Sequence, residues 1–253
     1  MKRTLIIFLA SILLIPSFAF SNIFTFKVGL FNPRADSDRW TEEFDQMDFA
    51  KSSFVNTNFG FGYEYFATRE ISIAISIDSY HKKKTGIYEG YVGYYYSSLG
   101  TDYDFAYPDI YVGDFLPAHS YSVTITPIQL SIKLTPMGRK GGLIPYLGGG
   151  VGLYIWSTRV QGDWIDFNDE WYDFDENVSI YPIYLADVQD DNRFDIGYHA
   201  FGGFMAPFAR RMSLEVEFKY NFAKGDLSED KFEGYEAFDL NGFQISIGVN
   251  YWF

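Results

Sequence analysis

The sequence contains no cysteine, and after residue 21 it has no apolar run long enough to cross a membrane as a helix. An exported form of this chain therefore has no disulfides to stabilise it. Any membrane span must consist of strands. Positive charge is also scarce, because 20 Lys and Arg stand against 33 Asp and Glu, a formal charge of −13. A basic surface for nucleic acid is thereby excluded.

Residues 1–21 have the pattern of a cleaved export signal. A basic start, Met1-Lys2-Arg3, precedes an apolar run that Pro16 interrupts, and small residues follow at Ala19 and Ser21. We expect cleavage after Ser21, which leaves residues 22–253 as one domain. The alternative is an uncleaved anchor, but the run is short against the about 20 apolar residues that a spanning helix needs.

In the last eleven residues every odd position is apolar, and the even positions are polar or glycine except Trp252. The apolar positions are Phe243, Ile245, Ile247, Val249, Tyr251 and Phe253. Such a period of two predicts a strand with one apolar and one polar face. In an outer-membrane barrel the apolar face meets lipid and the polar face lines the interior.

Seven further segments show a similar alternation and are predicted strands. They are residues 23–31, 54–66, 71–78, 121–134, 143–156, 194–208 and 212–222. In the fourth, the apolar phase changes at Pro127. We expect Tyr121, Val123 and Ile125 to face lipid as Ile128 does, with a β-bulge at the proline.

The connections between these segments alternate in length. Three are short, at residues 67–69, 136–142 and 209–210, and four are long, at residues 32–53, 82–120, 157–193 and 223–239. The pattern predicts an all-β fold, an eight-stranded antiparallel up-and-down transmembrane β-barrel with short periplasmic turns and four long extracellular loops. A soluble lipocalin-like barrel or β-sandwich is disfavoured, because its core would contain many charges.

The inward faces of the predicted strands carry charges of both signs. These residues are Lys27, Glu64, Asp78, Lys133, Glu215, Glu217 and Lys219. Eight strands enclose only enough space for side chains, and buried charges need partners. We therefore expect an interior plugged by ion pairs and hydrogen bonds. The rival interpretation is a proton or solute path along the same charges.

Two predicted loops have unusual compositions. The segment 163–176 is rich in carboxylates, and its candidate Ca²⁺ or Mg²⁺ ligands are Asp163, Asp166, Asp169, Glu170, Asp173 and Asp175. Trp171 stands where an EF-hand would need glycine, so a solvated acidic loop is the preferred interpretation and no cofactor is predicted. The segment 88–111 is rich in tyrosine, which suits either a recognition surface or self-packing rings.

Catalysis is not predicted. The histidines are His81, His119 and His199, and none has serine and carboxylate neighbours at a spacing that would form a triad. His81 and the lysines that follow it, residues 82–84, lie near the expected outer rim, where lipid phosphates would be.

Several of these segments resemble the small outer-membrane β-barrel superfamily, of the OmpA-transmembrane-domain and OmpX kind. They are the export signal, the stretch from Pro145 to Leu153, and the ending with Tyr251 and Phe253, which is similar to the family's assembly signal. The resemblance implies the barrel-assembly machinery, membrane lipid and lipopolysaccharide as partners, and the loops could bind an extracellular ligand.

The predicted function is a structural and surface-interaction scaffold that displays acidic, Tyr-rich loops from the cell outer membrane. Residues 26–33 also resemble OmpW-type barrels. That resemblance implies the alternative function, a conduit for small hydrophobic solutes.

Overall fold

The fold is a closed antiparallel barrel of eight strands. The computed structural model describes residues 22–95, 104–138, 141–232 and 234–253, so the predicted export signal lies outside the described residues. The barrel strands are β1 (Ile23–Pro33), β2 (Asn56–Phe66), β3 (Ile71–Ile87), β6 (Ala118–Leu134), β7 (Ile144–Ile165), β9 (Val178–Ala209), β10 (Met212–Phe222) and β13 (Gly242–Trp252). They pair in this order, and β13 pairs with β1 from Ile23–Trp252 to Pro33–Gly242. The predicted barrel is confirmed.

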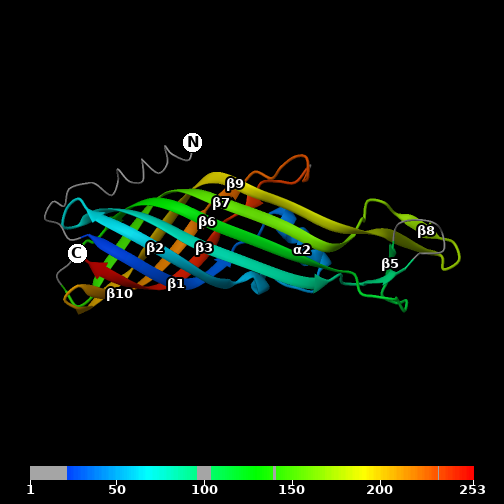
Figure 1. The fold of residues 1–253 in the computed structure, drawn as a ribbon, viewed down its shortest axis with the longest axis horizontal. Helices are drawn as coiled ribbons and strands as arrows, with labels where there is room; N and C mark the ends of the chain where they lie inside the picture. The colour runs from blue at the N-terminus through cyan, green and yellow to red at the C-terminus, as the bar shows by residue number, and fades with distance from the viewer. Residues whose placement is uncertain (1–21, 96–103, 139–140, 233) are drawn as a thin grey trace.

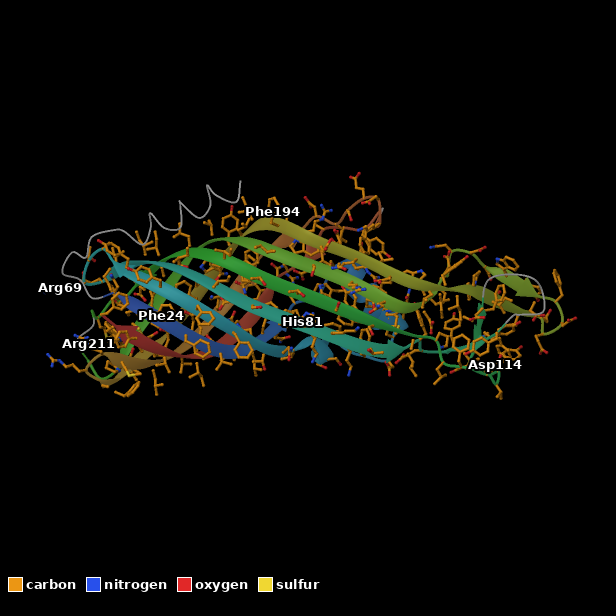
Figure 2. The ribbon with its side chains drawn as sticks, in the orientation of Figure 1. Phe24, Arg69, His81, Asp114, Phe194 and Arg211 are labelled. Carbon is orange, nitrogen blue, oxygen red and sulfur yellow. The ribbon has the colours of Figure 1, made fainter. Side chains whose placement is uncertain are left out.

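The outer wall of the barrel is apolar and the inner wall is polar over much of its length. On β13, Phe243, Ile245 and Ile247 are exposed, while Gln244 and Ser246 are buried. Figure 2 shows Phe24 on the same outer wall. In a soluble barrel the apolar side chains face inward. Here they face outward, which fits a wall in contact with lipid. Among the described helices, none has the length and hydropathy needed to cross a membrane.

Three strands continue well beyond their predicted ends, and β6 starts slightly earlier than predicted. β3 runs to Ile87, β6 starts at Ala118, β7 runs to Ile165 and β9 starts at Val178. The predicted loop boundaries there were wrong. The strands remain paired along these extensions, but the outward side chains become mostly polar, so the apolar alternation that marked the strands in the sequence stops. The extensions form an arm that projects past the barrel (Figure 1).

The arm carries three short strands at its far end: β4 (Tyr91–Tyr94), β5 (Asp104–Pro108) and β8 (Trp171–Asp173). β5 and β8 both pair with the first part of β9. The C-terminus lies at the opposite end of the molecule (Figure 1). We call that opposite end the turn end, because the connections from β2 to β3, β6 to β7 and β9 to β10 lie there.

Pro127 does not introduce a bulge. The register between β3 and β6 is the same on both sides of it, with Ile77 opposite Ile128 and Tyr80 opposite Ile125. The proline lacks an N–H and so interrupts the ladder locally without shifting it. Side chains therefore keep alternating, and Tyr121, Val123 and Ile125 point into the barrel, where they are buried. Their predicted lipid-facing orientation was wrong.

The segment between β1 and β2, predicted as a loop, folds into the arm end of the barrel. It contains the helix α2 (Asp38–Gln46) and the 3-10 helix η1 (Lys51–Phe54). One side of α2 is buried, with Trp40 at its centre. A two-strand ladder, β11 (Lys224–Gly225) with β12 (Phe238–Asp239), packs beside it. The inward apolar side chains of β6 thus meet α2.

Candidate functional site

The interior of the barrel is filled in three layers. At the turn end lies an apolar floor that contains Phe66, Ile144 and Met205, with Trp252 packed against it. A charged layer follows, and an aromatic layer around α2 closes the arm end. The charged layer is therefore covered by apolar side chains on both sides.

The charged layer is held by direct ion pairs. Lys27 Nζ lies 2.7 Å from Glu217 Oε1, and Lys219 Nζ lies 2.8 Å from Asp78 Oδ2. Lys219 also donates a hydrogen bond of 2.8 Å to Gln129 Oε1. Because all of these groups are buried, each charge depends on its partner for stabilisation.

A second set of contacts continues this layer toward the floor. Lys133 Nζ lies 3.0 Å from Glu64 Oε2 and 3.7 Å from Glu215 Oε2. The Tyr146 hydroxyl and the Asn250 amide each donate a hydrogen bond of 2.7 Å to Glu215. The structure thus brings all seven predicted interior charges into one buried layer.

The space left within the charged layer is small. A cavity of about 40 Å³ is lined by residues that include Lys27, Glu64, Lys133 and Glu217. Such a volume holds about one or two water molecules. A solute of any size would have to displace the ion pairs to pass.

The aromatic layer is built around Trp40 of α2. Its ring packs at centroid distances of 5.0 Å from Phe54 and 5.3 Å from both Tyr121 and Phe238. The indole N–H of Trp40 donates a hydrogen bond of 3.1 Å to the carbonyl of Asp239. These contacts fix α2 inside the barrel mouth.

A buried polar group ties α2 to the barrel wall, and sequence reasoning missed it. Arg39 pairs with Glu43, and His119 Nε2 of β6 lies 2.7 Å from Glu43 Oε2. Burial alone would raise the pKa of Glu43, but Arg39 and the His119 hydrogen bond outweigh it and hold this pKa below its usual value. Glu43 and His119 are far apart in sequence, so only the fold brings them together.

The histidines do not form a catalytic group. His119 faces inward, whereas the neighbouring Ser120 faces the other side of β6. Ser131 Oγ and His199 Nε2 are 2.7 Å apart, a contact not predicted from the sequence. Both are buried inside the barrel, and His199 Nδ1 has no hydrogen-bond partner among the described residues. A triad is therefore not assembled at this pair.

The arm concentrates the negative charge of the chain. The outer part of the arm, residues 85–95, 104–117 and 160–190 among those described, contains 13 Asp and Glu and no Lys or Arg, whereas the inner part of the extensions carries Lys82, Lys83, Lys84 and Arg159. The whole chain has 33 acidic and 20 basic residues. Outside these segments 20 acidic residues balance 20 basic ones, so the outer part of the arm carries a charge equal to the formal charge of −13.

The arm is packed as well as charged. Val92, Phe105 and Ile180 form a small apolar core, and the Tyr107 hydroxyl donates a hydrogen bond of 2.7 Å to Asp173. Of the predicted Tyr-rich surface, Tyr96 and Tyr103 lie outside the described residues. Three of the described tyrosines pack on one another, with Tyr107 at 4.5 Å from Tyr94 and 5.8 Å from Tyr111. The other three, Tyr88, Tyr91 and Tyr95, pack on rings from outside the segment.

Large apolar side chains remain exposed at the far end of the arm. The exposed fractions are 81% for Ile110, 91% for Val112 and 87% for Phe174. Figure 2 places Asp114 in the same part of the molecule. Apolar side chains within an acidic surface are typical of interaction sites.

The six candidate metal ligands serve mainly as local hydrogen-bond acceptors. Asp163 accepts from the backbone N–H of Ala118, Asp166 from that of Asn168, and Asp169 from the indole of Trp171. The other three candidates are Glu170, Asp173 and Asp175. Within the described part of the chain, no group of three or more acidic or histidine side chains is placed to hold a metal ion.

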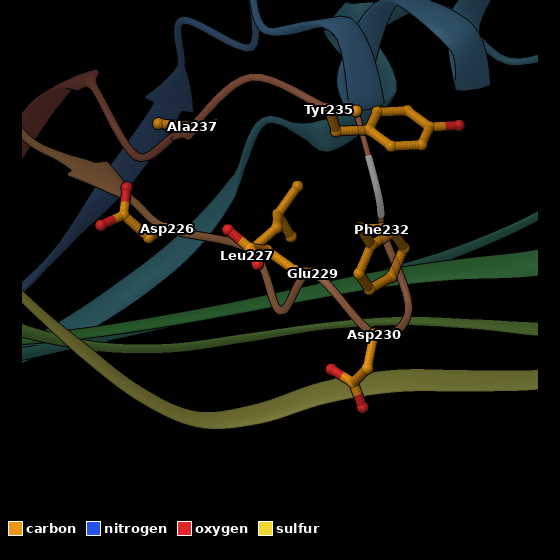
Figure 3. Close-up of a pocket in the computed structure, with 8 residues that line it drawn as sticks. Asp226, Leu227, Glu229, Asp230, Phe232, Tyr235 and Ala237 are labelled. Atoms are coloured by element: carbon orange, nitrogen blue, oxygen red, sulfur yellow. The ribbon is translucent and has the colours of Figure 1, made fainter.

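A surface hollow of about 890 Å³ lies in the connection between β10 and β13 (Figure 3). Acidic residues line it together with Leu227, Phe232 and Tyr235. Burial, together with a hydrogen bond to Glu42, raises the pKa of Tyr235 to about 12. This tyrosine therefore stays protonated and connects the hollow to α2.

The two residues of the predicted assembly signal lie on the outer wall. Tyr251 and Phe253 are exposed, and their rings stack at 6.2 Å. Tyr251 pairs in register with Phe24 of β1. Both side chains are therefore accessible from outside the barrel.

The chain is similar to outer-membrane protein OprG from Pseudomonas aeruginosa, with 13% identity, coverage of 93% of this chain and 96% of that one, and a TM-score of 0.49. It is also similar to Neisserial surface protein A, with 12% identity, coverage of 92% and 97%, and a TM-score of 0.44. The closed barrel of eight antiparallel strands is shown by the strand pairing itself.

A third similar structure is Ail of Yersinia pestis in complex with the heparin analogue sucrose octasulfate. The identity is 9%, the coverage is 92% of this chain and 99% of that one, and the TM-score is 0.44. No protein-family model matches the sequence, and no curated protein matches it.

Proposed function

We propose that this protein is an integral outer-membrane barrel with a sealed interior that serves as a scaffold for recognition at the cell surface. The apolar outer wall and the eight closed strands support a membrane position. Residues 1–21 would direct export, and the exposed Tyr251 and Phe253 would be read by the barrel-assembly machinery. The connections at the turn end would then face the periplasm.

The filled interior favours a scaffold over a channel. Ion pairs such as Lys27–Glu217 and Lys219–Asp78 occupy the middle of the barrel, and α2 fills its mouth. A rigid, sealed barrel holds the arm at a fixed orientation above the membrane.

The charge of the arm is the observation that carries this proposal. The packed outer part of the arm, with 13 acidic residues and no basic ones among those described, attracts cationic surfaces over long range. The exposed Ile110, Val112 and Phe174 would supply the apolar contacts of the bound state. The partner that fits is an extracellular protein or peptide surface that is basic and partly apolar.

Binding of two synthetic probes would test this role. One is an alternating Lys-Leu peptide and the other an alternating Lys-Ser peptide of equal length and charge. The folded barrel should bind the Lys-Leu peptide more tightly, and a variant with Asp109→Asn, Asp114→Asn, Asp169→Asn and Glu170→Gln should bind it about tenfold more weakly.

The matched control neutralises four acidic residues away from the arm, namely Glu70→Gln, Asp226→Asn, Glu229→Gln and Asp230→Asn. It should retain affinity within about twofold. Equal losses in the two variants would show that the arm is not the recognition surface.

A conduit for small hydrophobic solutes is the second candidate, and one feature of β9 favours it. β9 pairs with β5 up to Ile183 and with β10 from Tyr198, and between these positions no described strand pairs with it on that side. Phe194 and Ile196, within this interval, are 70% and 75% exposed. Uptake of an apolar dye into vesicles only when the barrel is present would support this function.

A further inference from the structure

The charged layer of the barrel contains one more carboxylate than ammonium groups. Its charged side chains are all buried, with exposed fractions of 2–6%, and they are Lys27, Lys133 and Lys219 against Glu64, Asp78, Glu215 and Glu217. The apolar floor and the aromatic layer cover this layer from both ends. One surplus negative charge buried in this way is costly unless a further positive charge accompanies it.

His199, a titratable side chain on the same inner wall, does not supply that charge. Its Nε2 lies 2.7 Å from Ser131 Oγ, and its Nδ1 has no hydrogen-bond partner among the described residues. A protonated imidazole carries an N–H on both nitrogens, so one charged donor would be buried without an acceptor. Because a neutral His199 avoids this cost, the layer still lacks one positive charge.

Two buried oxygens of the inner wall accept no hydrogen bond from the described residues. Lys219 donates to Asp78 Oδ2, but Asp78 Oδ1 has no partner, and neither has Asn58 Oδ1. Asp78 is 3% exposed and Asn58 is 2% exposed. Carboxylate and amide oxygens can only accept, and a buried acceptor without a partner is costly. A cation beside these oxygens would remove that cost and the charge imbalance together.

The strand registers bring these oxygens to the same part of the wall. Asn58 of β2 pairs with Gly29 of β1, and Gly29 pairs on its other side with Ser246 of β13, whose buried hydroxyl also has no partner in the described part of the chain. Gly60, the next inward residue of β2, lies opposite Asp78. A Cβ at Gly60 would overlap Asp78 Oδ1, so this oxygen lies directly over the glycine. Carboxylate, amide and hydroxyl oxygens therefore border two positions that have no side chain.

We propose that the charged layer binds one monovalent alkali cation, held by the oxygens of Asp78, Asn58 and Ser246. The imbalance sets the valence, because a divalent ion would reverse the net charge of the layer instead of removing it. Oxygen ligands suit such a hard cation. Lys219 Nζ pairs with Asp78 Oδ2 at 2.8 Å, so Asp78 Oδ1 remains for the cation.

The cation is then a structural part of the plug, enclosed as the barrel folds around it. This goes beyond the scaffold function, and it depends on neither the arm nor its partner. Peptide binding to the arm and cation binding in the interior are measured separately, so the failure of one proposal leaves the other standing.

Unfolding by urea in a non-ionic detergent tests the site. The pH and the ionic strength are held constant while sodium replaces N-methylglucamine. An increase in sodium of about a hundredfold should raise the ratio of folded to unfolded protein by about tenfold or more, because the cation binds only the folded state.

Variants of Asn58 locate the cation. Asn58→Leu removes a ligand that belongs to no ion pair and should abolish the sodium dependence, whereas Asn58→Asp keeps an oxygen ligand and should retain it. Asn56→Leu is the matched control on the same strand, because the Asn56 amide donates instead to the carbonyl of His81. It should show the sodium dependence of the parent protein.

Three results would overturn the proposal. An equal sodium dependence in Asn58→Leu would place the cation elsewhere. A folded fraction of the parent protein that follows pH but not sodium would assign the missing charge to a proton. A parent protein that responds to neither would have only ordered water at these oxygens.

Discussion

The two halves of the barrel interior are built from the same strands but held by different forces. In β6, Lys133 and Gln129 belong to the charged layer, whereas Tyr121 and Val123 belong to the aromatic layer. The outward side chains change in the opposite sense, from Ile132 and Ile128 to Thr124 and Ser122. One strand therefore has the pattern of a membrane protein in one half and of a soluble protein in the other. The surroundings of the wall, lipid or water, determine which face must be apolar.

Removal of one cation from the charged layer should have the largest effect. Lys219→Met leaves Asp78 buried without its ion pair and should lower the free energy of unfolding by about 3–5 kcal/mol. Urea unfolding in detergent would measure this loss. The double variant Lys219→Met with Asp78→Leu should recover much of this loss, because no buried charge is then left unpaired. A loss below about 1 kcal/mol in the single variant would show that Asp78 does not depend on Lys219 for its stabilisation.

Removal of the central ring of the aromatic layer should cost somewhat less. Trp40→Ala empties a fully buried site and should destabilise the barrel mouth by about 3 kcal/mol, the lower end of the usual range, because α2 can partly relax. Limited proteolysis should then cut within residues 34–55 while the strands stay intact. Cleavage at the parent rate would show that α2 is not held by Trp40.

The aromatic layer should also respond to acid through Glu43. Its pKa in the folded protein lies below the unfolded value, so its stabilisation is full above about pH 4.3 and is lost as the pH falls through the folded-state value. Tryptophan fluorescence during acid titration would report the release of α2. Glu43→Gln should weaken this transition, and an unchanged transition would assign it to another group.

An exposed ion pair provides the smallest expected effect. Arg34 and Asp36 lie 2.6 Å apart, but both are solvated. Arg34→Gln should change the free energy of unfolding by no more than about 0.5 kcal/mol. A loss comparable to that of Lys219→Met would mean that burial does not distinguish the two kinds of pair.

The contrast between the two halves also explains what could be predicted from the sequence. β10 was predicted with its observed ends, Met212 and Phe222, because its outward apolar and inward polar residues alternate without exception. The inward direction of Tyr121 was mispredicted, because along β6 the inward side chains change from polar to apolar while the outward ones change from apolar to polar. α2 was missed, because its docking on His119 and Phe238 depends on contacts that no local pattern contains.

The arm and the polar outward side chains of β3, β6 and β7 were accessible to sequence reasoning only in part. The acidic segment near Asp163 and the lysines after His81 were recognised, but their positions depended on strands longer than predicted. Only the registers place Lys83 beside Ser122 and Arg159. Composition therefore predicts whether a segment forms an acidic or a basic surface more readily than it predicts which residues lie beside that segment.

The central claim, that the interior is sealed, is tested most directly by single-channel recording. The refolded protein would be inserted into a planar bilayer, with its shift in electrophoretic mobility on boiling as the check of folding. The parent protein and the variant with Glu215→Gln and Glu217→Gln should show no steady conductance, although the variant should unfold more easily. Reproducible discrete openings of the folded parent protein would contradict the sealed interior.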